Sequence, residues 1–118
     1  MSLLDLRTSN LGQEHVAHAH SHHQLILATC GVTELAIEGV GDRVTGGRGC
    51  LIPCACHHEY KGDGRNRTLV LDVSLDALGD RRDGDSLQRL FERPRFFPVS
   101  PRLNHLAVTL MAQLEQFP

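Results

Sequence analysis

The sequence has few aromatic residues, no long basic run and no long apolar run. It contains four Phe, one Tyr and no Trp in 118 residues. Its most basic segments, GDRRDGD and FERPRFFP, mix both signs or hold scattered arginines, and the formal net charge is −2. Nucleic-acid binding through counterion release therefore has little support. If this protein acts on DNA, another segment must supply the contacts.

Signals for export and for membrane insertion are also missing. The N-terminus, MSLLDLRTSN, has charged residues inside its apolar patch, which excludes the basic-then-apolar pattern of a secretory signal. No apolar stretch approaches the roughly 18 residues that cross a bilayer. We therefore expect a cytoplasmic protein with no membrane partner. Its four cysteines are then expected to be reduced thiols or metal ligands, namely Cys30, Cys50, Cys54 and Cys56.

The length allows one domain, and its first three-quarters has the pattern of short strands. EHVAHAH and TELAIEG alternate, HQLILAT is a fuller apolar run, and RVTGGRGCLIP, HHEYK and RTLVLDVS follow. VGD, TGGRG and KGDGRN are the turn signals. Strands at such spacing, with no helical period between them before about residue 75, predict an all-β sandwich or barrel.

The chain beyond about residue 75 has a different pattern. DGDSLQRLFERP predicts a short helix capped at Asp85 or Ser86, and RFFPV predicts an extended segment. A clearer helix follows, with Ser100 as N-cap and Pro101 in the first helical position. Its apolar stripe is either packed on the domain's own barrel or forms a two-fold contact, which we favour. The dimer residues are then Leu103, Leu106, Leu110, Met111 and Leu114.

Five of the eight histidines lie in the segment GQEHVAHAHSHHQLILATCG. Residues two apart on a strand point to the same face, so His18 and His20 are predicted to project together. Two imidazoles placed in this way can bind one divalent metal, and Gln24 could add a carbonyl oxygen from an adjacent strand. Such ligands suit zinc, iron, nickel, copper or manganese, and the sequence does not choose among them.

The spacing around these residues resembles the two conserved motifs of the cupin superfamily. The first motif is matched by Gly12, His18, His20, Gln24 and Gly31, with Gln24 in place of glutamate. The second is matched by Gly47, Pro53, Ala55 and His58, with Ala55 in place of glycine and Gly62 where asparagine is expected. The resemblance implies a double-stranded β-helix barrel, the RmlC-like jelly roll, with a short C-terminal helical extension. It also implies that the metal ligands are His18, His20, Gln24 and His58.

A narrower resemblance is to the N-terminal sensor domain of AraC-type transcription regulators. It is carried by the H-x-H…QL…G opening, the LIP…H middle, and LVLDVS followed by SPRLNHLAVTLMAQLE. In that family the barrel binds a small-molecule effector, the following helices make a dimer contact, and a C-terminal pair of helix-turn-helix motifs binds DNA. The resemblance implies a sensor core over residues 1–80, a dimerising extension over 81–118 and a DNA-binding domain outside this chain. The end of the chain at EQFP fits a larger protein trimmed at a domain edge.

Effector contacts are expected at the four metal-ligand positions and at His57, which a one-residue slip of register would turn inward in place of His58. The alternative function is a stand-alone metal-dependent cupin enzyme, such as a dioxygenase, an isomerase or a sugar-processing protein. Such an enzyme needs a general acid or base in the barrel, and no residue apart from the histidines fits that role. A storage or structural cupin ranks third.

Several of these residues also have simpler interpretations. The histidines at 18, 20 and 58 could line a barrel that holds no metal, and His15, His22, His23 and His57 are expected to be solvated. Cys54 and Cys56 are expected in the tight turn of the second motif, with partly buried thiols, because a structural zinc site would want a second ligand pair. Asp72, the charged residue in the apolar strand LVLDVS, is expected to face outward.

Overall fold

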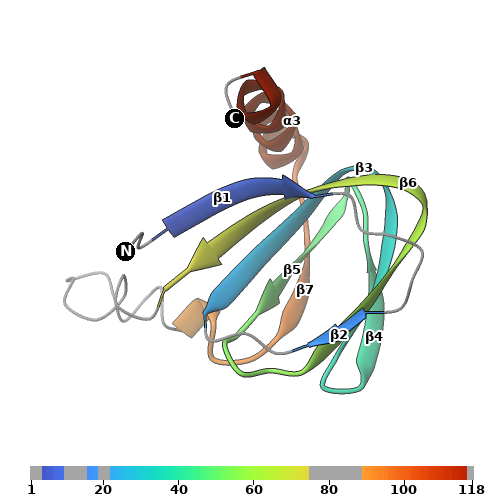
Figure 1. Ribbon diagram of the computed structural model, residues 1–118, viewed down its shortest axis with the longest axis vertical. Helices are drawn as coiled ribbons and strands as arrows, with labels where there is room; N and C mark the ends of the chain where they lie inside the picture. Colours follow the sequence, from blue (N-terminus) through green and yellow to red (C-terminus); the bar gives the residue numbers. More distant parts are fainter. Residues whose placement is uncertain (1–3, 10–15, 19–21, 75–88, 117–118) are drawn as a thin grey trace.

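Two long, bent strands form the centre of the fold (Figure 1). They are β3, His23–Ile37, and β6, His58–Val73, and they pair antiparallel along almost their whole length. This is a computed structural model, and it describes residues 4–9, 16–18, 22–74 and 89–116. The remaining elements are β1 Leu4–Ser9, β2 Val16–His18, β4 Val40–Val44, β5 Arg48–Ile52, β7 Arg95–Pro98 and α3 Pro101–Gln116.

All the strands in the described part of the chain belong to one curled sheet. Its order is β1-β6-β3-β5-β7, while β2 pairs with the start of β6 and β4 pairs with the end of β3. The register of β3 against β6 shifts twice between Ala28 and Val32, where Gly31 has a φ of +77°. At this bend both strands turn, and their two arms descend on opposite sides of the barrel in Figure 1. The predicted mostly-β fold with a C-terminal helix is confirmed.

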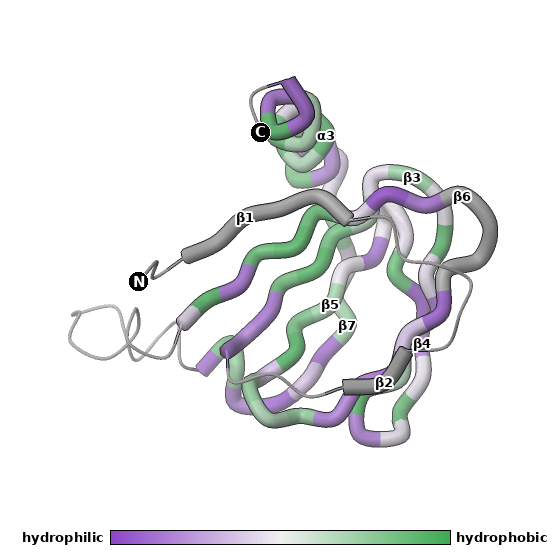
Figure 2. Tube along the Cα trace, in the orientation of Figure 1, coloured by the Kyte–Doolittle hydropathy of each residue, from purple (hydrophilic) through white to green (hydrophobic). Residues whose placement is uncertain are grey.

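The core has one layer inside the barrel and two outside it. The inner layer is made by Ile26, Ala28, Leu35, Ile37, Val44, Cys50, Ile52 and Val70. On the outer face, Leu27 and Leu69 pack against Ala107 and Met111 of α3, and Leu51 and Val73 pack against Phe91. Because both faces of β3 and β6 are covered here, their sequences are nearly continuous apolar runs. Figure 2 shows these runs; β3 becomes hydrophilic at its lower left end, and β6 is interrupted by a hydrophilic position near its own.

Two of the predicted turns are wrong. KGDGRN lies within β6, because the bend of the sheet is made by register shifts on β3 and not by a chain reversal. VGD lies within β4, and the reversal occurs two residues earlier, at Glu38 and Gly39, with φ of +49° and +83°. Two positive φ values in a row make the kind of two-residue hairpin turn that suits the strand twist. The TGGRG turn is confirmed by the reciprocal backbone bonds between Thr45 and Arg48.

The C-terminal helix begins as predicted. The hydroxyl of Ser100 accepts a hydrogen bond from the Leu103 amide at 3.1 Å, and Pro101 is the first residue of α3. The extended segment predicted at RFFPV is confirmed as β7, Arg95–Pro98. Most of the predicted helix at DGDSLQRLFERP and the predicted boundary between residues 80 and 81 lie outside the described residues. Within the described part of the chain, no helix is long and apolar enough to cross a membrane.

Candidate functional site

A polar cluster lies where the last residues of β6 meet the first of β3. Gln24 is paired with Asp72 in the ladder, and its amide Nε2 donates a hydrogen bond to Asp72 Oδ1 at 2.9 Å. His22 Nε2 lies 3.2 Å from the same oxygen. Gln24 alternates with Ile26 of the inner layer and is only 4% exposed, so the cluster faces the inside of the barrel.

The outward orientation expected for Asp72 is wrong. Asp72 is two residues from Val70, which belongs to the inner layer, so both side chains point to the same face. The strand LVLDVS is apolar on both faces, and its pattern alone does not show which face is interior. The cupin motif usually has a carboxylate at position 24, and here a carboxylate lies beside Gln24 across the sheet, from Asp72 on β6. The solvated positions expected for His22 and His23 are wrong, because His22 contacts this carboxylate and His23 is only 7% exposed.

His58 lies at the other end of β6 and also faces inward. It is 1% exposed, and its ladder partners are Ile37 of the inner layer and His18 on β2. Its Nδ1 lies 3.3 Å from the carbonyl oxygen of Cys56. His57 is exposed, and its amide donates to Glu38 Oε1 at 3.0 Å. The slip of register that would turn His57 inward is therefore not present.

A tight turn at residues 53–56 positions His58. The Cys56 amide donates to the Pro53 carbonyl at 3.3 Å, and Ala55 has a φ of +63°. That backbone region favours glycine, which gives a physical reason for the glycine usual at this place in the motif. The turn is tied to the barrel because the Cys54 amide donates to His23 Nδ1 at 2.9 Å. The predicted turn with partly buried thiols at Cys54 and Cys56 is confirmed.

Burial changes the ionisation of several groups near this turn. The pKa of His23 is lowered by desolvation and by the neighbouring His22, and its ring stacks on Phe91 with centroids 4.5 Å apart. Desolvation, with a contribution from Glu38, raises the pKa of Cys56. Burial raises the pKa of Cys50 to about 12. All four cysteines are free, and neither perturbed thiol has the lowered pKa of a reactive one.

The described residues bring only part of the predicted ligand set together. The backbones of His18 and His58 are direct partners across β2 and β6, whereas Gln24 pairs with Asp72 at the far end of β6. His20 lies outside the described residues, and the side chain of His18 is likewise not described. Among the described residues, no three His, Cys, Asp or Glu side chains form a group that could hold a metal ion. This part of the chain does not by itself make a metal centre.

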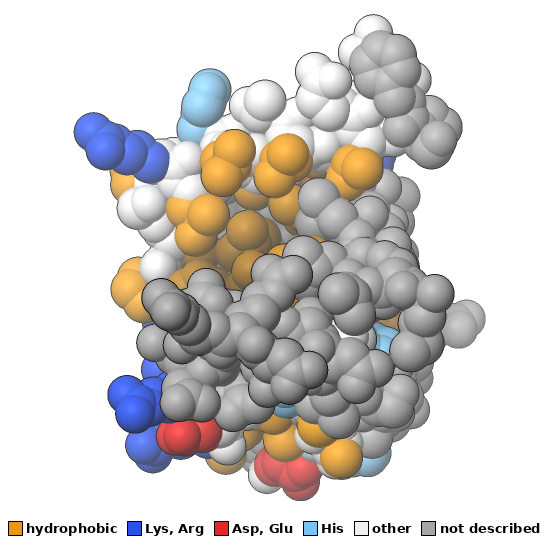
Figure 3. Space-filling model, turned by 90° about the vertical axis from the view of Figure 1, so that its left-hand side faces the viewer, with side chains coloured by type: hydrophobic (Ala, Val, Ile, Leu, Met, Phe, Trp, Pro, Cys, Tyr) orange, Lys and Arg blue, Asp and Glu red, His pale blue; other side chains and the backbone are white. Residues whose placement is uncertain are grey.

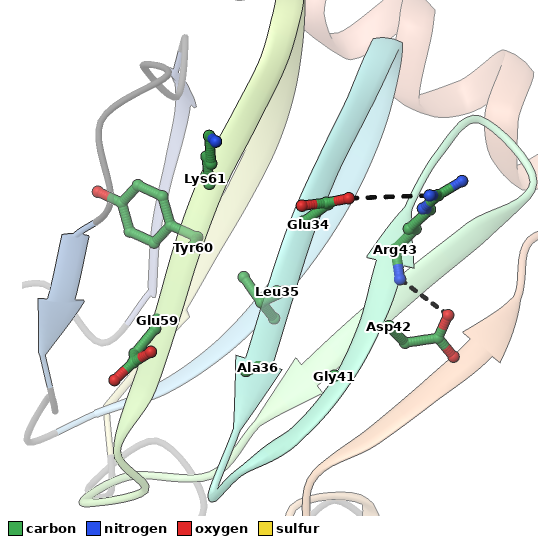
Figure 4. A pocket seen from close by; sticks show the side chains of 9 residues that line it. All are labelled: Glu34, Leu35, Ala36, Gly41, Asp42, Arg43, Glu59, Tyr60 and Lys61. Carbon is green, nitrogen blue, oxygen red and sulfur yellow. Dashed lines mark hydrogen bonds and ion pairs between the residues drawn. The ribbon is translucent and has the colours of Figure 1, made fainter.

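A separate groove lies on the outer face of β6, β3 and β4 (Figure 4). It has a volume of about 470 Å³ and is lined by Glu34, Leu35, Ala36, Gly41, Asp42, Arg43, Glu59, Tyr60 and Lys61. Its charges partly neutralise one another, as in the 3.8 Å contact between Arg43 and Glu34, whose side chains are 67% and 53% exposed. None of the predicted site residues lines this groove, and we place the candidate site inside the barrel.

The apolar stripe of α3 is divided between the barrel and the surface. Met111 is 6% exposed and packs with Leu27 and Leu69, while Leu106 is 51% exposed. The other predicted dimer residues, Leu103, Leu110 and Leu114, are partly buried against the same cluster. Figure 3 shows hydrophobic side chains gathered along and below the helix. Part of the stripe therefore holds α3 on its own barrel, and part remains on the surface.

Known structures share the fold. ToxT from Vibrio cholerae aligns over 96% of this chain and 48% of its own, with a TM-score of 0.67 and 10% identity. A cupin-2 domain protein from Shewanella frigidimarina aligns over 62% of this chain and 72% of its own, with a TM-score of 0.55 and 15% identity. Oxalate decarboxylase from Bacillus subtilis, described with Mn(II) centres, aligns over 60% of this chain and 21% of its own, with a TM-score of 0.54 and 16% identity. These likenesses establish the cupin fold.

Comparison of sequences identifies a narrower family than comparison of folds does. An uncharacterised HTH-type transcriptional regulator of Bacillus subtilis, YobQ, is 34% identical over 62 residues, which are 52% of this chain and 26% of the relative. The chain thus matches about a quarter of that relative's length. The family model of the AraC-like ligand binding domain matches residues 6–117. The chain belongs to the family of AraC-like ligand-binding domains.

Proposed function

We propose that this domain senses a small-molecule effector that binds inside the barrel, at the cluster of Gln24, Asp72 and His22. The observation that carries the proposal is the partly buried pairing of the Gln24 amide with the Asp72 carboxylate at 2.9 Å. Burying polar groups costs free energy unless they are hydrogen-bonded, and a few polar groups inside an apolar wall are what fixes a ligand's orientation. His58 adds an imidazole to the same interior.

The test is a thermal-shift screen of small polar metabolites, with each hit measured again on two variants. Asp72→Ala removes the carboxylate of the cluster, and Glu34→Ala removes a carboxylate of the outer groove as the matched control. We expect a hit to raise the Tm of the wild type and of Glu34→Ala but to lose most of its effect on Asp72→Ala. A hit that depends on Glu34 and not on Asp72 would place the effector in the groove and contradict the proposal.

We also propose that His18, His20, Gln24 and His58 bind a divalent transition metal, of the zinc, iron, nickel or manganese group. A carbonyl oxygen only accepts hydrogen bonds, so a hydrogen bond between His58 Nδ1 and the Cys56 carbonyl, which lie 3.3 Å apart, needs the proton on Nδ1. Metal-ligating histidines commonly have their other ring nitrogen held by a carbonyl in this way, and this contact supports His58 as a ligand. No step of the proposed sensing depends on this metal.

Metal analysis of purified protein tests the ligand set. His58→Ala and His18→Ala are each expected to lower the metal content well below that of the wild type. His57→Ala is the matched control, because His57 is an exposed neighbour on the same chain segment. Equal metal content in all four proteins would remove these ligands from consideration.

The whole protein is proposed to be a cytoplasmic transcription regulator that acts as a homodimer. The support comes from the AraC-like family and from the helix-turn-helix regulator that matches this chain over part of its length. In this proposal the exposed part of the α3 stripe, including Leu106, contacts a second copy. DNA contacts would come from a helix-turn-helix region that is not among these residues. Effector binding would then act on DNA by favouring one arrangement of the dimer over another.

A further inference from the structure

Thr33 carries a buried hydroxyl for which the structure shows no hydrogen-bond partner. Its side chain is 0% exposed, and Oγ1 is among the few buried side-chain polar atoms without a partner in the described part of the chain. Buried polar groups of folded proteins are nearly always hydrogen-bonded, and each exception calls for an explanation. Leaving one unsatisfied lowers stability. The hydroxyl therefore lowers the stability of the folded domain, and no hydrogen bond in the described structure offsets this cost.

The position of Thr33 directs this hydroxyl into the barrel. Thr33 alternates with Leu35 and Ile37, and its ladder partner on β4 is Val44. All three neighbours belong to the inner layer, and residues directly opposite in an antiparallel ladder share a face. On its other side Thr33 pairs with Gly62 of β6. The hydroxyl thus lies among apolar side chains of the interior, away from the cluster at Gln24 and Asp72.

A second threonine in the same barrel provides the contrast. Thr68 on β6 is also 0% exposed and pairs with Ala28 of the inner layer, but it does have an interaction partner. Thr68 Oγ1 is not among the buried polar atoms without a partner in the described part of the chain, whereas Thr33 Oγ1 is. A residue that a fold does not need, kept at a cost in stability, is typical of a functional position.

We propose that Thr33 is a specificity-determining residue that makes a hydrogen bond to the effector inside the barrel. This inference rests on the proposed function, because it assumes that the effector enters the barrel, and it adds a second contact point beyond the cluster at Asp72. The Thr33 contact selects effectors that carry a hydroxyl or another hydrogen-bonding group at the end of the molecule remote from Asp72. A purely apolar end would leave the Thr33 hydroxyl unsatisfied in the complex as well.

The first experiment needs no ligand and compares Thr33→Val with Thr68→Val by thermal unfolding. Valine keeps the shape of threonine and removes only the hydroxyl. We expect Thr33→Val to raise the Tm by about 3 °C or more, since it removes an unsatisfied polar group. Thr68→Val is expected to lower the Tm by a similar amount. A Thr33→Val protein whose Tm falls as far as that of Thr68→Val would overturn the inference, because the hydroxyl would then be structural.

The second experiment titrates ethylene glycol, a minimal diol, and follows the side-chain methyl resonances of Thr33 and the side-chain amide of Gln24 by NMR. We expect the Thr33 methyl to shift in the wild type. In Thr33→Val, binding measured at the remaining barrel resonances should weaken about tenfold, whereas Thr68→Val should keep the wild-type affinity. A shift at Gln24 alone overturns the role of Thr33 and leaves the proposed function standing. Equal affinity of the wild type and Thr33→Val for ethylene glycol also overturns the role of Thr33.

Discussion

Gln24 and Asp72 are direct partners across β3 and β6, and the amide of one donates to the carboxylate of the other. The pair depends on one partner being neutral. Gln24→Glu would place two carboxylates side by side inside the barrel. We expect it to lower the free energy of unfolding by about 2 kcal/mol at neutral pH, as measured by urea unfolding.

The control for this prediction is the double variant Gln24→Glu with Asp72→Asn, which restores one amide and one carboxylate with their places exchanged. It should recover most of the lost stability. The loss of unfolding free energy in Gln24→Glu should also be smaller at about pH 5, because at that pH two adjoining carboxylates can share a proton. A loss that is the same at both pH values and in the double variant would mean that packing, not charge, is responsible.

A second prediction concerns Gly49 on β5. Two core side chains lie directly against this glycine. A Cβ atom at this position would lie 2.7 Å from Phe97 Cζ, 2.8 Å from Leu27 Cδ2 and 3.1 Å from the Ile26 carbonyl oxygen. Gly49→Ala is therefore expected to lower the free energy of unfolding by about 1–3 kcal/mol. The control is Gly46→Ala, whose nearest neighbour would be Asn104 Oδ1 at an ordinary 3.7 Å. Similar urea midpoints for the two variants would contradict the close packing.

The third prediction concerns the turn that leads to His58. Ala55 has a φ of +63°, a conformation that costs a residue with a Cβ about 1–2 kcal/mol. Ala55→Gly relieves this strain but adds backbone entropy to the unfolded chain, which offsets part of the gain. We expect a net stabilisation of about 0.5–1 kcal/mol by urea unfolding. Ala36→Gly, in the regular part of β3, should be destabilising instead, and a loss in both variants would show that Ala55 is not strained.

The motif spacing predicted the fold and the inward position of His58, because glycine turns and alternating residues are local features. It did not reveal the cluster at Asp72. Position 72 is 48 residues from Gln24, and the β6 strand is apolar on both faces, so the sequence contains no sign of which face is interior. The same limit applies to KGDGRN, where turn-forming residues continue a strand because the neighbouring strand bends with them. Thr33 could not be singled out either, since an unpartnered hydroxyl is a property of the packed barrel.

The fourth prediction is a dependence of stability on alkaline pH. Burial raises the pKa of Cys50 to about 12 in the folded state, against about 8.5 in an unfolded chain. The stability that this thiol contributes is complete below pH 8.5 and is lost as the pH rises toward 12. Across that window the slope of unfolding free energy should include about 1.4 kcal/mol per pH unit from Cys50. Cys50→Ala should lack this component, and an unchanged slope would contradict the assignment.

The last prediction separates the two parts of the α3 stripe. Met111 is 6% exposed and Thr29 Oγ1 contacts its sulfur at 2.9 Å, so Met111→Ala should cost about 2–4 kcal/mol of stability through the cavity it leaves. Leu106 is 51% exposed, so Leu106→Asp should leave the unfolding of the monomer almost unchanged. In the proposed homodimer the same Leu106→Asp change buries a charge at the contact, and sedimentation should show a weaker dimer. A wild-type domain that stays monomeric at all concentrations, or a dimer that tolerates aspartate at position 106, would rule out this part of α3 as the contact.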